Sequence, residues 1–169
     1  SSYLDMGGTQ DFTLFVVLKR NGGASDDNTI IGGDTHDQKI YIANEETIYY
    51  CTDNNDAGGG APPSGQAGVN SKFVFPTDTW TDAKVIMTIS KTNVGGFTWR
   101  KNGVTVSGVE TGASNTINIG QNLKIKHLGA LDDGTDTTND KHMNGSFYEL
   151  IYYTSKLTDT QIYDINNYL

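Results

Sequence analysis

The end of the chain constrains the fold most strongly, because its closing strand is apolar on both faces and a short helix follows directly. The strand is expected over Ser146–Tyr153. One face is expected to carry Tyr148, Leu150 and Tyr152, and the other Phe147, Ile151 and Tyr153. Only a strand that is covered on both sides needs two apolar faces. We therefore expect one face to meet an opposing sheet and the other to meet the helix or a covering loop.

The helix that follows has clear start signals and an apolar stripe. Thr158 can cap it, and Gln161 three residues later completes a capping box. Leu157 before the cap and Ile162 after it are placed for a hydrophobic staple. The stripe consists of Ile162, Ile165 and Leu169. With about three turns the helix is too short to be stable alone, so we expect it to dock on the sheet.

The rest of the sequence consists of short strands separated by turn residues. It contains 20 glycines with abundant Asn, Asp and Thr, and this density of turns is typical of a sandwich or barrel. At 169 residues the chain suits one domain, residues 1–169. Besides the closing strand, we expect strands at Tyr3–Met6, Phe12–Arg20, Thr29–Ile31, Lys39–Ala43, Thr47–Cys51, Lys72–Phe75, Ala83–Ser90, Gly96–Lys101, Val104–Ser107, Thr116–Ile119 and Leu123–Leu128. The sequence therefore predicts an all-β sandwich or barrel.

The dipeptide Asn102-Gly103 predicts a hairpin. Asn-Gly suits a two-residue type I′ turn, in which both central residues have positive φ. This turn places Arg100 opposite Thr105 and Trp99 opposite Val106. Phe97, Trp99, Val104 and Val106 then share one face. We expect Trp99 to be a core residue, although a tryptophan could also serve as a platform for a sugar.

Several segments, taken in order, resemble the laminin G-like and concanavalin A-like jelly rolls. They are Tyr3–Met6 followed by Asp11–Lys19, Thr79–Met87 with its tryptophan, Phe97–Val104, Asn118–Gly120, and Asn144-Gly145 with the closing strand and helix. The resemblance implies an all-β, two-sheet antiparallel jelly-roll sandwich with one short C-terminal helix. It also implies recognition of carbohydrates or of a protein partner, in some members with calcium at the rim. Ile151 and the insertion Asp53–Asn70 depart from the family pattern.

The net charge and the hydropathy of the chain limit the classes of partner that it is expected to bind. The formal net charge of −8 disfavours nucleic acid and anionic membranes, which bind basic patches. No apolar run approaches the roughly 20 residues of a membrane helix, so we expect no membrane insertion. The one cysteine, Cys51, cannot form an internal disulfide. The chain begins Ser-Ser-Tyr-Leu without a leader, so we expect a domain of a longer protein. An extracellular, cell-surface or virion location follows only from the resemblance.

The acidic residues do not form a catalytic pattern. Glycoside hydrolysis needs two carboxyl groups that flank the bond, about 5–5.5 Å apart in retaining enzymes. The glutamates are Glu45, Glu46, Glu110 and Glu149, and no strand presents two acids in alternation. We expect Glu149 to be buried and paired, because an unpaired buried carboxylate is costly. We expect no catalytic residues, although a glycoside hydrolase or polysaccharide lyase with acids on loops stays open.

An acidic loop suggests calcium. Asp132, Asp133 and Asp136 lie close together in the sequence, and Asn139 and Asp140 follow shortly after them. Calcium takes six to eight oxygen ligands from carboxylates, amides and carbonyls. The alternative is an ordinary solvated loop, since Asp and Asn readily form Asx turns. The loop Asp53–Asn70 likewise has two open interpretations, a functional loop or a passive excursion.

The candidate ligand-binding residues are Asp34, His36, Tyr41, Tyr49 and Arg100. Tyr41 and Tyr49 each alternate with aliphatic neighbours, so they are expected to face away from the core, toward a sheet surface or rim. They could instead merely cover the sheet.

These patterns and the family resemblance leave three alternative functions open. The first is a non-catalytic carbohydrate-binding or adhesion domain of a larger cell-surface or viral protein. The second is a structural or assembly domain without a small ligand, and the third is an enzyme of the same fold.

Overall fold

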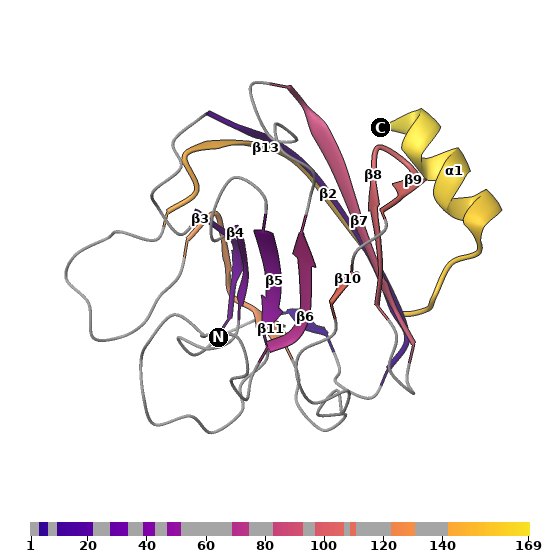
Figure 1. Cartoon of the computed structure of the whole chain (residues 1–169), viewed down its shortest axis with the longest axis horizontal. Coiled ribbons are helices and arrows are strands. Elements are labelled where there is room, and N and C mark those ends of the chain that lie inside the picture. Colours follow the sequence, from indigo (N-terminus) through magenta and orange to yellow (C-terminus); the bar gives the residue numbers. More distant parts are fainter. Residues whose placement is uncertain are drawn as a thin grey trace.

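Strands and one terminal helix make up the computed structural model (Figure 1). It describes residues 4–6, 10–21, 28–33, 39–42, 47–51, 69–74, 83–92, 97–106, 109–110, 123–130 and 142–169. Within these residues the strands form two large antiparallel sheets and one small sheet. The predicted all-β sandwich with one short C-terminal helix is confirmed.

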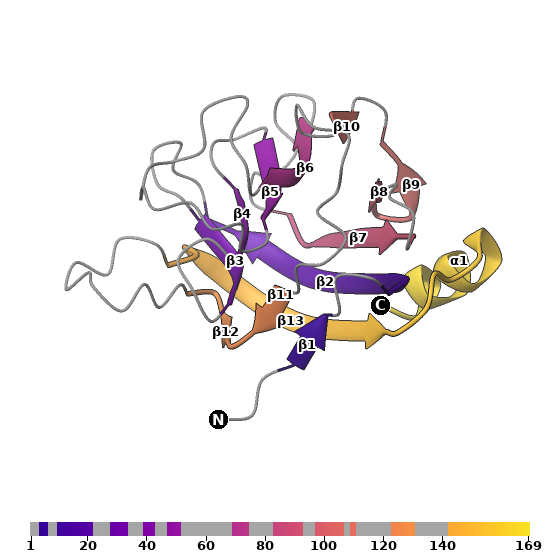
Figure 2. The ribbon, with the colours of Figure 1, turned by 90° about the horizontal axis from the view of Figure 1, so that it is seen from below.

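The first large sheet has five strands. Their order is β13 (Gly145–Tyr153), β2 (Phe12–Arg20), β7 (Val85–Lys91), β8 (Phe97–Lys101) and β9 (Val104–Thr105). The closing strand therefore pairs with a strand near the start of the chain. In Figure 1 this sheet lies between the other large sheet and the terminal helix, and Figure 2 shows β2 and β13 running side by side.

The second large sheet has six strands. Their order is β10 (Val109–Glu110), β6 (Val69–Val74), β5 (Thr47–Cys51), β4 (Lys39–Ile42), β3 (Asn28–Gly32) and β12 (His127–Leu128). The small sheet pairs β1 (Leu4–Met6) with β11 (Leu123–Ile125). The strand predicted over Leu123–Leu128 is thus two strands that join different sheets. The strand predicted at Thr116–Ile119 lies outside the described residues.

The main core lies between the two large sheets. Leu14, Val16 and Leu18 of β2 meet Ile40 and Ile42 of the opposing sheet in one buried cluster. The largest member of this cluster is Trp99, which is fully buried. Its predicted core position is confirmed.

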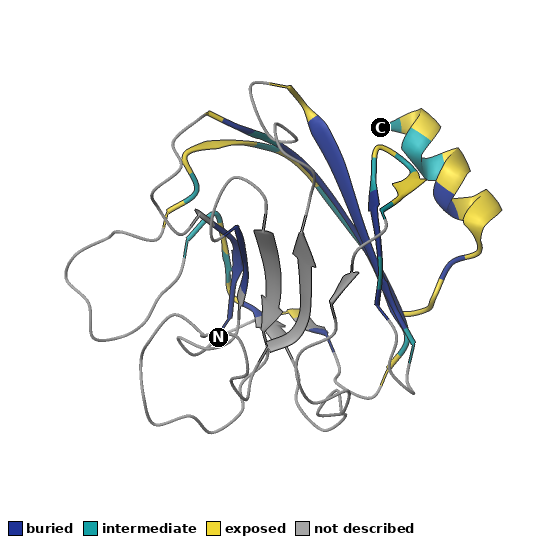
Figure 3. Cartoon of the chain, viewed as in Figure 1, coloured by how far each residue is buried: buried dark blue, intermediate teal, exposed yellow. Residues whose placement is uncertain are grey.

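A second apolar cluster joins helix α1 (Asp159–Tyr168) to the outer face of the five-stranded sheet. It contains Phe15, Val17, Ile86, Leu157 and Ile162, with Ile151 and Tyr153 packed beside them. Figure 3 shows the buried sheet beneath the helix and exposed residues on the helix side that faces away from it. The predicted docking of the helix on one face of the closing strand is confirmed.

The start of α1 follows the sequence signals. Thr158 Oγ1 accepts a hydrogen bond from the backbone N–H of Gln161 at 3.3 Å. Gln161 Oε1 accepts one from the backbone N–H of Thr158 at 2.9 Å. Leu157 and Ile162 are both buried in the cluster beneath the helix. The predicted capping box is confirmed, and the staple residues share one cluster.

The hairpin between β8 and β9 has the predicted turn and register. Asn102 has φ of 50° and Gly103 has φ of 79°. Arg100 lies opposite Thr105. Val104 is 70% exposed, so it does not join Trp99 in the core as its face predicts, because the sheet ends at this strand.

The structure of β13, which contains a β-bulge, corrects the predictions for three residues. The register shifts between Phe147 and Glu149, so Phe147 lies opposite Leu18 and packs against the main core. The strict alternation expected from sequence put Phe147 on the helix face, which is wrong. Tyr148 is 57% exposed instead of facing the core. Glu149 is also exposed, so its predicted burial and pairing are wrong.

Candidate functional site

A row of residues crosses five neighbouring strands of the six-stranded sheet. Thr29 of β3 lies opposite Tyr41 of β4, and Tyr41 lies opposite Tyr49 of β5. Tyr49 in turn lies opposite Lys72 of β6, and Lys72 opposite Glu110 of β10. We call these five positions the outer row.

The outer row lies on the sheet face that points away from the main core. Ile40 and Ile42 flank Tyr41 along β4, and both are fully buried in that core. Successive residues of a strand point to opposite faces, so Tyr41 and its register partners take the other face. This placement agrees with the direction predicted for Tyr41 from its neighbours Ile40 and Ile42, and the direction predicted for Tyr49 stays a prediction.

The structure brings the two predicted tyrosines together, but it does not leave both open. Tyr41 is only 2% exposed, whereas a sugar platform must present its ring to solvent. Alternation in the sequence gives the direction of a side chain and not what covers it. The backbone position of Tyr49 is directly opposite, and its side chain lies outside the described part.

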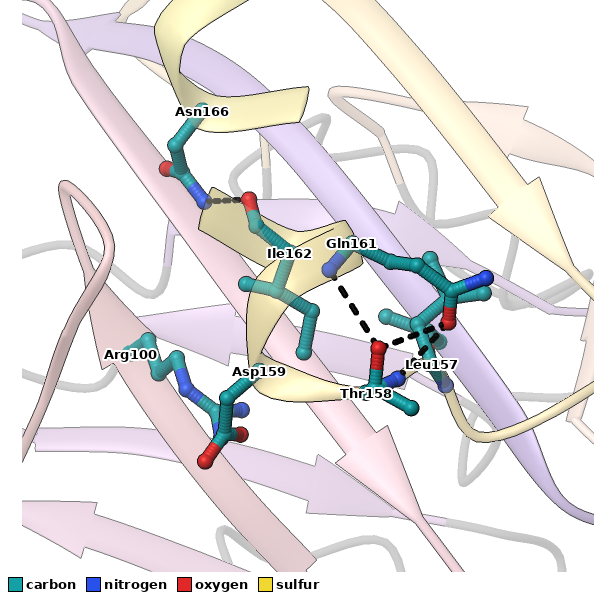
Figure 4. Close-up of polar contacts among 8 residues, drawn as sticks. Arg100, Leu157, Thr158, Asp159, Gln161, Ile162 and Asn166 are labelled. Carbon is teal, nitrogen blue, oxygen red and sulfur yellow. Dashed lines mark hydrogen bonds and ion pairs between the residues drawn. The ribbon is translucent and has the colours of Figure 1, made fainter. Parts of the chain in front are cut away.

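Arg100 lies far from this row in the fold, on the five-stranded sheet. Its side chain reaches the first turn of α1, where Nη2 donates to Asp159 Oδ1 at 2.6 Å (Figure 4). The residue is only 6% exposed. Arg100 therefore holds the helix to the sheet in this structure, and it does not join Tyr41 and Tyr49.

The other predicted site residues cannot be placed. Asp34 and His36 lie outside the described residues, between β3 and β4 in sequence. Asp132, Asp133 and Asp136 also lie outside them. In the described part alone, no three His, Cys, Asp or Glu side chains gather in a way that could hold a metal ion.

Sequence reasoning missed Lys72 and Glu110. The two positions are direct partners across β6 and β10. Lys72 could have been suspected from its alternation with Ser71 and Phe73. Glu110 could not, because β10 has only two residues and its partner strand is distant in sequence.

Other aromatic side chains are exposed on the opposite side of the molecule. Tyr148 is 57% exposed, and Lys84 Nζ lies 6.0 Å from the centroid of its ring. Lys84 Nζ also donates to the backbone oxygen of Leu169 at 2.8 Å. Tyr163 on α1 is 64% exposed. Single exposed tyrosines are common on protein surfaces, so neither tyrosine marks a binding site by itself.

Two lysines on the five-stranded sheet have lowered pKa values. Burial disfavours the charged form of Lys91 and lowers its pKa, while Asp11 acts in the opposite direction more weakly. Lys91 Nζ also lies 5.9 Å from the ring centroid of Phe12. Burial lowers the pKa of Lys101 in the same way. These shifts belong to the sheet that carries α1, not to the outer row.

The two sheets, the core between them and the terminal helix define a β-sandwich domain. The sequence matches no protein-family model and no curated protein sequence. Among solved structures, the binding domain of botulinum neurotoxin DC, in complex with rat synaptotagmin II, is 14% identical with a TM-score of 0.61. That match covers 95% of this chain and 36% of the other.

Two further structures are similar. Trypanosoma rangeli sialidase in complex with sialic acid is 12% identical with a TM-score of 0.55, and the match covers 94% of this chain and 23% of that one. A Bacteroides ovatus protein whose proposed role is carbohydrate binding is 11% identical with a TM-score of 0.54, covering 96% and 41%. This chain thus spans less than half the length of each. At such identities the likeness establishes the fold.

No helix in the described residues has both the length and the apolar character to cross a membrane.

Proposed function

We propose that this chain is a non-catalytic carbohydrate-binding domain of a larger cell-surface or viral protein, with a concanavalin A-like jelly-roll fold. The observation that carries the proposal is the outer row, where the Tyr49 position lies between the buried residues Thr29 and Tyr41 on one side and Lys72 and Glu110 on the other. Sugars are bound by aromatic rings beside hydrogen-bonding groups. The buried Tyr41 then supports the neighbouring strand, and Tyr49 is the residue that contacts the sugar.

The fold comparisons support a binding role in general terms. One similar structure is a toxin binding domain in complex with synaptotagmin, and another has a proposed role in carbohydrate binding. Fold alone does not establish function, so the proposal rests on the outer row. Recognition of a surface protein is the alternative that the toxin structure favours.

The distribution of acids supports a domain without catalysis. Within the described strands, Asp5, Glu110 and Glu149 each belong to a different sheet. A retaining glycosidase holds two carboxyl groups about 5–5.5 Å apart. The sialidase likeness makes a hydrolase the competing function, which an assay for release of reducing sugar decides.

A glycan array with the wild-type protein tests the proposal. We expect binding to at least one glycan class, and Tyr49→Ala to weaken it about tenfold or more, because one buried aromatic side chain contributes roughly 1.5–3 kcal/mol. Tyr163→Ala is the matched control, since it removes an exposed tyrosine from α1 and should leave binding unchanged. No glycan bound, or equal binding by wild type and Tyr49→Ala, would overturn the proposal.

A further inference from the structure

Three buried polar atoms lie on the outer face of the five-stranded sheet without a hydrogen-bond partner among the described residues. They are Thr88 Oγ1, Ser90 Oγ and Arg100 Nη1. Thr88 and Ser90 are fully buried. A buried polar group that lacks a partner is unfavourable, and each such group in a folded protein calls for an explanation, of which a bound ion or water is one.

The register places these residues side by side. Thr88 lies directly opposite Arg100 across β7 and β8, and Ser90 is two residues further along β7 on the same face. Their side chains therefore occupy neighbouring positions of one face.

The segment that leads into α1 passes over these positions. Thr13 lies opposite Ser90. Thr13 Oγ1 accepts a hydrogen bond from the backbone N–H of Leu157 at 2.9 Å and donates to the backbone oxygen of Ser155 at 3.0 Å. Arg100 reaches Asp159 at the other side of this segment (Figure 4). The three polar atoms are thus enclosed between the sheet and the start of the helix.

The positive charge of Arg100 is only partly compensated. The side chain of Arg100 is 8% exposed, whereas that of Asp159 is 90% exposed and contacts it through one atom pair. Solvent screens an exposed carboxylate, and a buried charge needs further partners. The N-terminus of α1 adds positive potential in the same place.

We propose that a small monovalent anion of the size of chloride binds between β7, β8 and the start of α1. Arg100 Nη1 and the hydroxyl groups of Thr88 and Ser90 can all donate hydrogen bonds to a single acceptor. An anion accepts all three and adds to the partial compensation by Asp159, whereas a water molecule adds no negative charge. The bound anion would stabilise the docked helix. This inference is independent of the proposed carbohydrate site.

Crystals of the wild-type protein soaked in sodium bromide test the inference, because bromide gives an anomalous signal. We expect a peak within hydrogen-bonding distance of Arg100 Nη1 and of both hydroxyl groups. The double variant Thr88→Val, Ser90→Ala removes two donors at nearly constant volume and should lose the peak. Absence of a peak, or water density in its place, would overturn the inference. A peak that persists in the double variant would indicate an adventitious ion only and also overturn it.

Thermal unfolding provides a readout in solution. The wild-type protein should unfold at a higher temperature in sodium chloride than in sodium gluconate of equal concentration, because gluconate is too large to enter. The double variant should lose this difference. Thr105→Val is the matched control, since Thr105 lies opposite Arg100 but is exposed, and it should keep the difference. An equal response of all three proteins would contradict a specific site.

Discussion

Gly145 is required by the close approach of two strands. It begins β13 and lies opposite Arg20 of β2, and a Cβ atom placed on it would clash with the backbone oxygen of Lys19. Backbone cannot yield as the end of a flexible side chain can. We expect Gly145→Ala to lower the free energy of unfolding by about 1–3 kcal/mol through overpacking, measured by urea denaturation.

Ser146→Ala provides the control for this prediction. Ser146 is the next residue of the same strand and is exposed, so its truncation should change the free energy of unfolding by less than about 0.5 kcal/mol. Equal stability of Gly145→Ala and wild type would show that β13 does not approach β2 this closely.

Because Lys91 is buried, we expect the free energy of unfolding to depend on pH in the alkaline range. Burial lowers its pKa in the folded protein from the ordinary value of 10.5. Between the folded pKa and 10.5 the unfolded chain binds more protons, so the free energy of unfolding rises with pH. This contribution is complete above the unfolded pKa and is lost as pH falls through the folded pKa.

Replacing Lys91 isolates that contribution. Lys91→Met should show a smaller rise in stability on the alkaline side than wild type, measured by urea denaturation at several pH values. Lys156→Met removes one positive charge from an exposed position and controls for net charge. A slope that is the same in Lys91→Met and wild type would contradict the burial of the ammonium group.

The cap of α1 contributes to the stability of the whole fold. The helix has 10 residues, and isolated helices of that length are marginal in water, so its start and its docking are coupled. Thr158→Ala should lower the free energy of unfolding by about 1 kcal/mol. Thr160→Ala, at an exposed position inside the same helix, should cost less, since alanine favours helices. Equal losses would show that the cap makes no special contribution.

Elements whose signals are local could be predicted from the sequence. The bounds of β2 and β5 agree with the predicted Phe12–Arg20 and Thr47–Cys51, because each is a continuous run between turn residues. The turn at Asn102-Gly103 fixed the register of its hairpin. The bulge at Phe147–Glu149 was missed, since a bulge depends on the partner strand and leaves the alternation of the sequence unchanged.

The candidate site was only partly predictable, because it is assembled from strands of the whole chain. The directions of Tyr41 and Tyr49 follow from their neighbours, but their pairing with Lys72 and Glu110 depends on strands that are distant in sequence. Arg100 was grouped with the tyrosines, although it lies on the other large sheet. The alternation of residues along one strand shows which of them share a face. Which strands lie side by side depends on the order of strands in the sheets, which the sequence does not show.

A calcium site formed by Asp132, Asp133 and Asp136 stays a prediction. If these carboxylates bind calcium, millimolar calcium should raise the melting temperature of wild type relative to EDTA, because a ligand of the folded state stabilises it. The double variant Asp132→Asn, Asp133→Asn should lose the increase. An unchanged melting temperature of wild type in calcium would remove the site.

A nuclear magnetic resonance titration tests the outer row most directly. Isotope-labelled protein would be titrated with the glycan that binds best on the array, and the shifts of the backbone amide signals would be mapped on the fold. We predict the largest shifts at Tyr41, Tyr49 and Lys72 and their neighbours on β4, β5 and β6. Shifts concentrated on α1, β8 and β9, with the six-stranded sheet unaffected, would contradict a ligand site on the outer row.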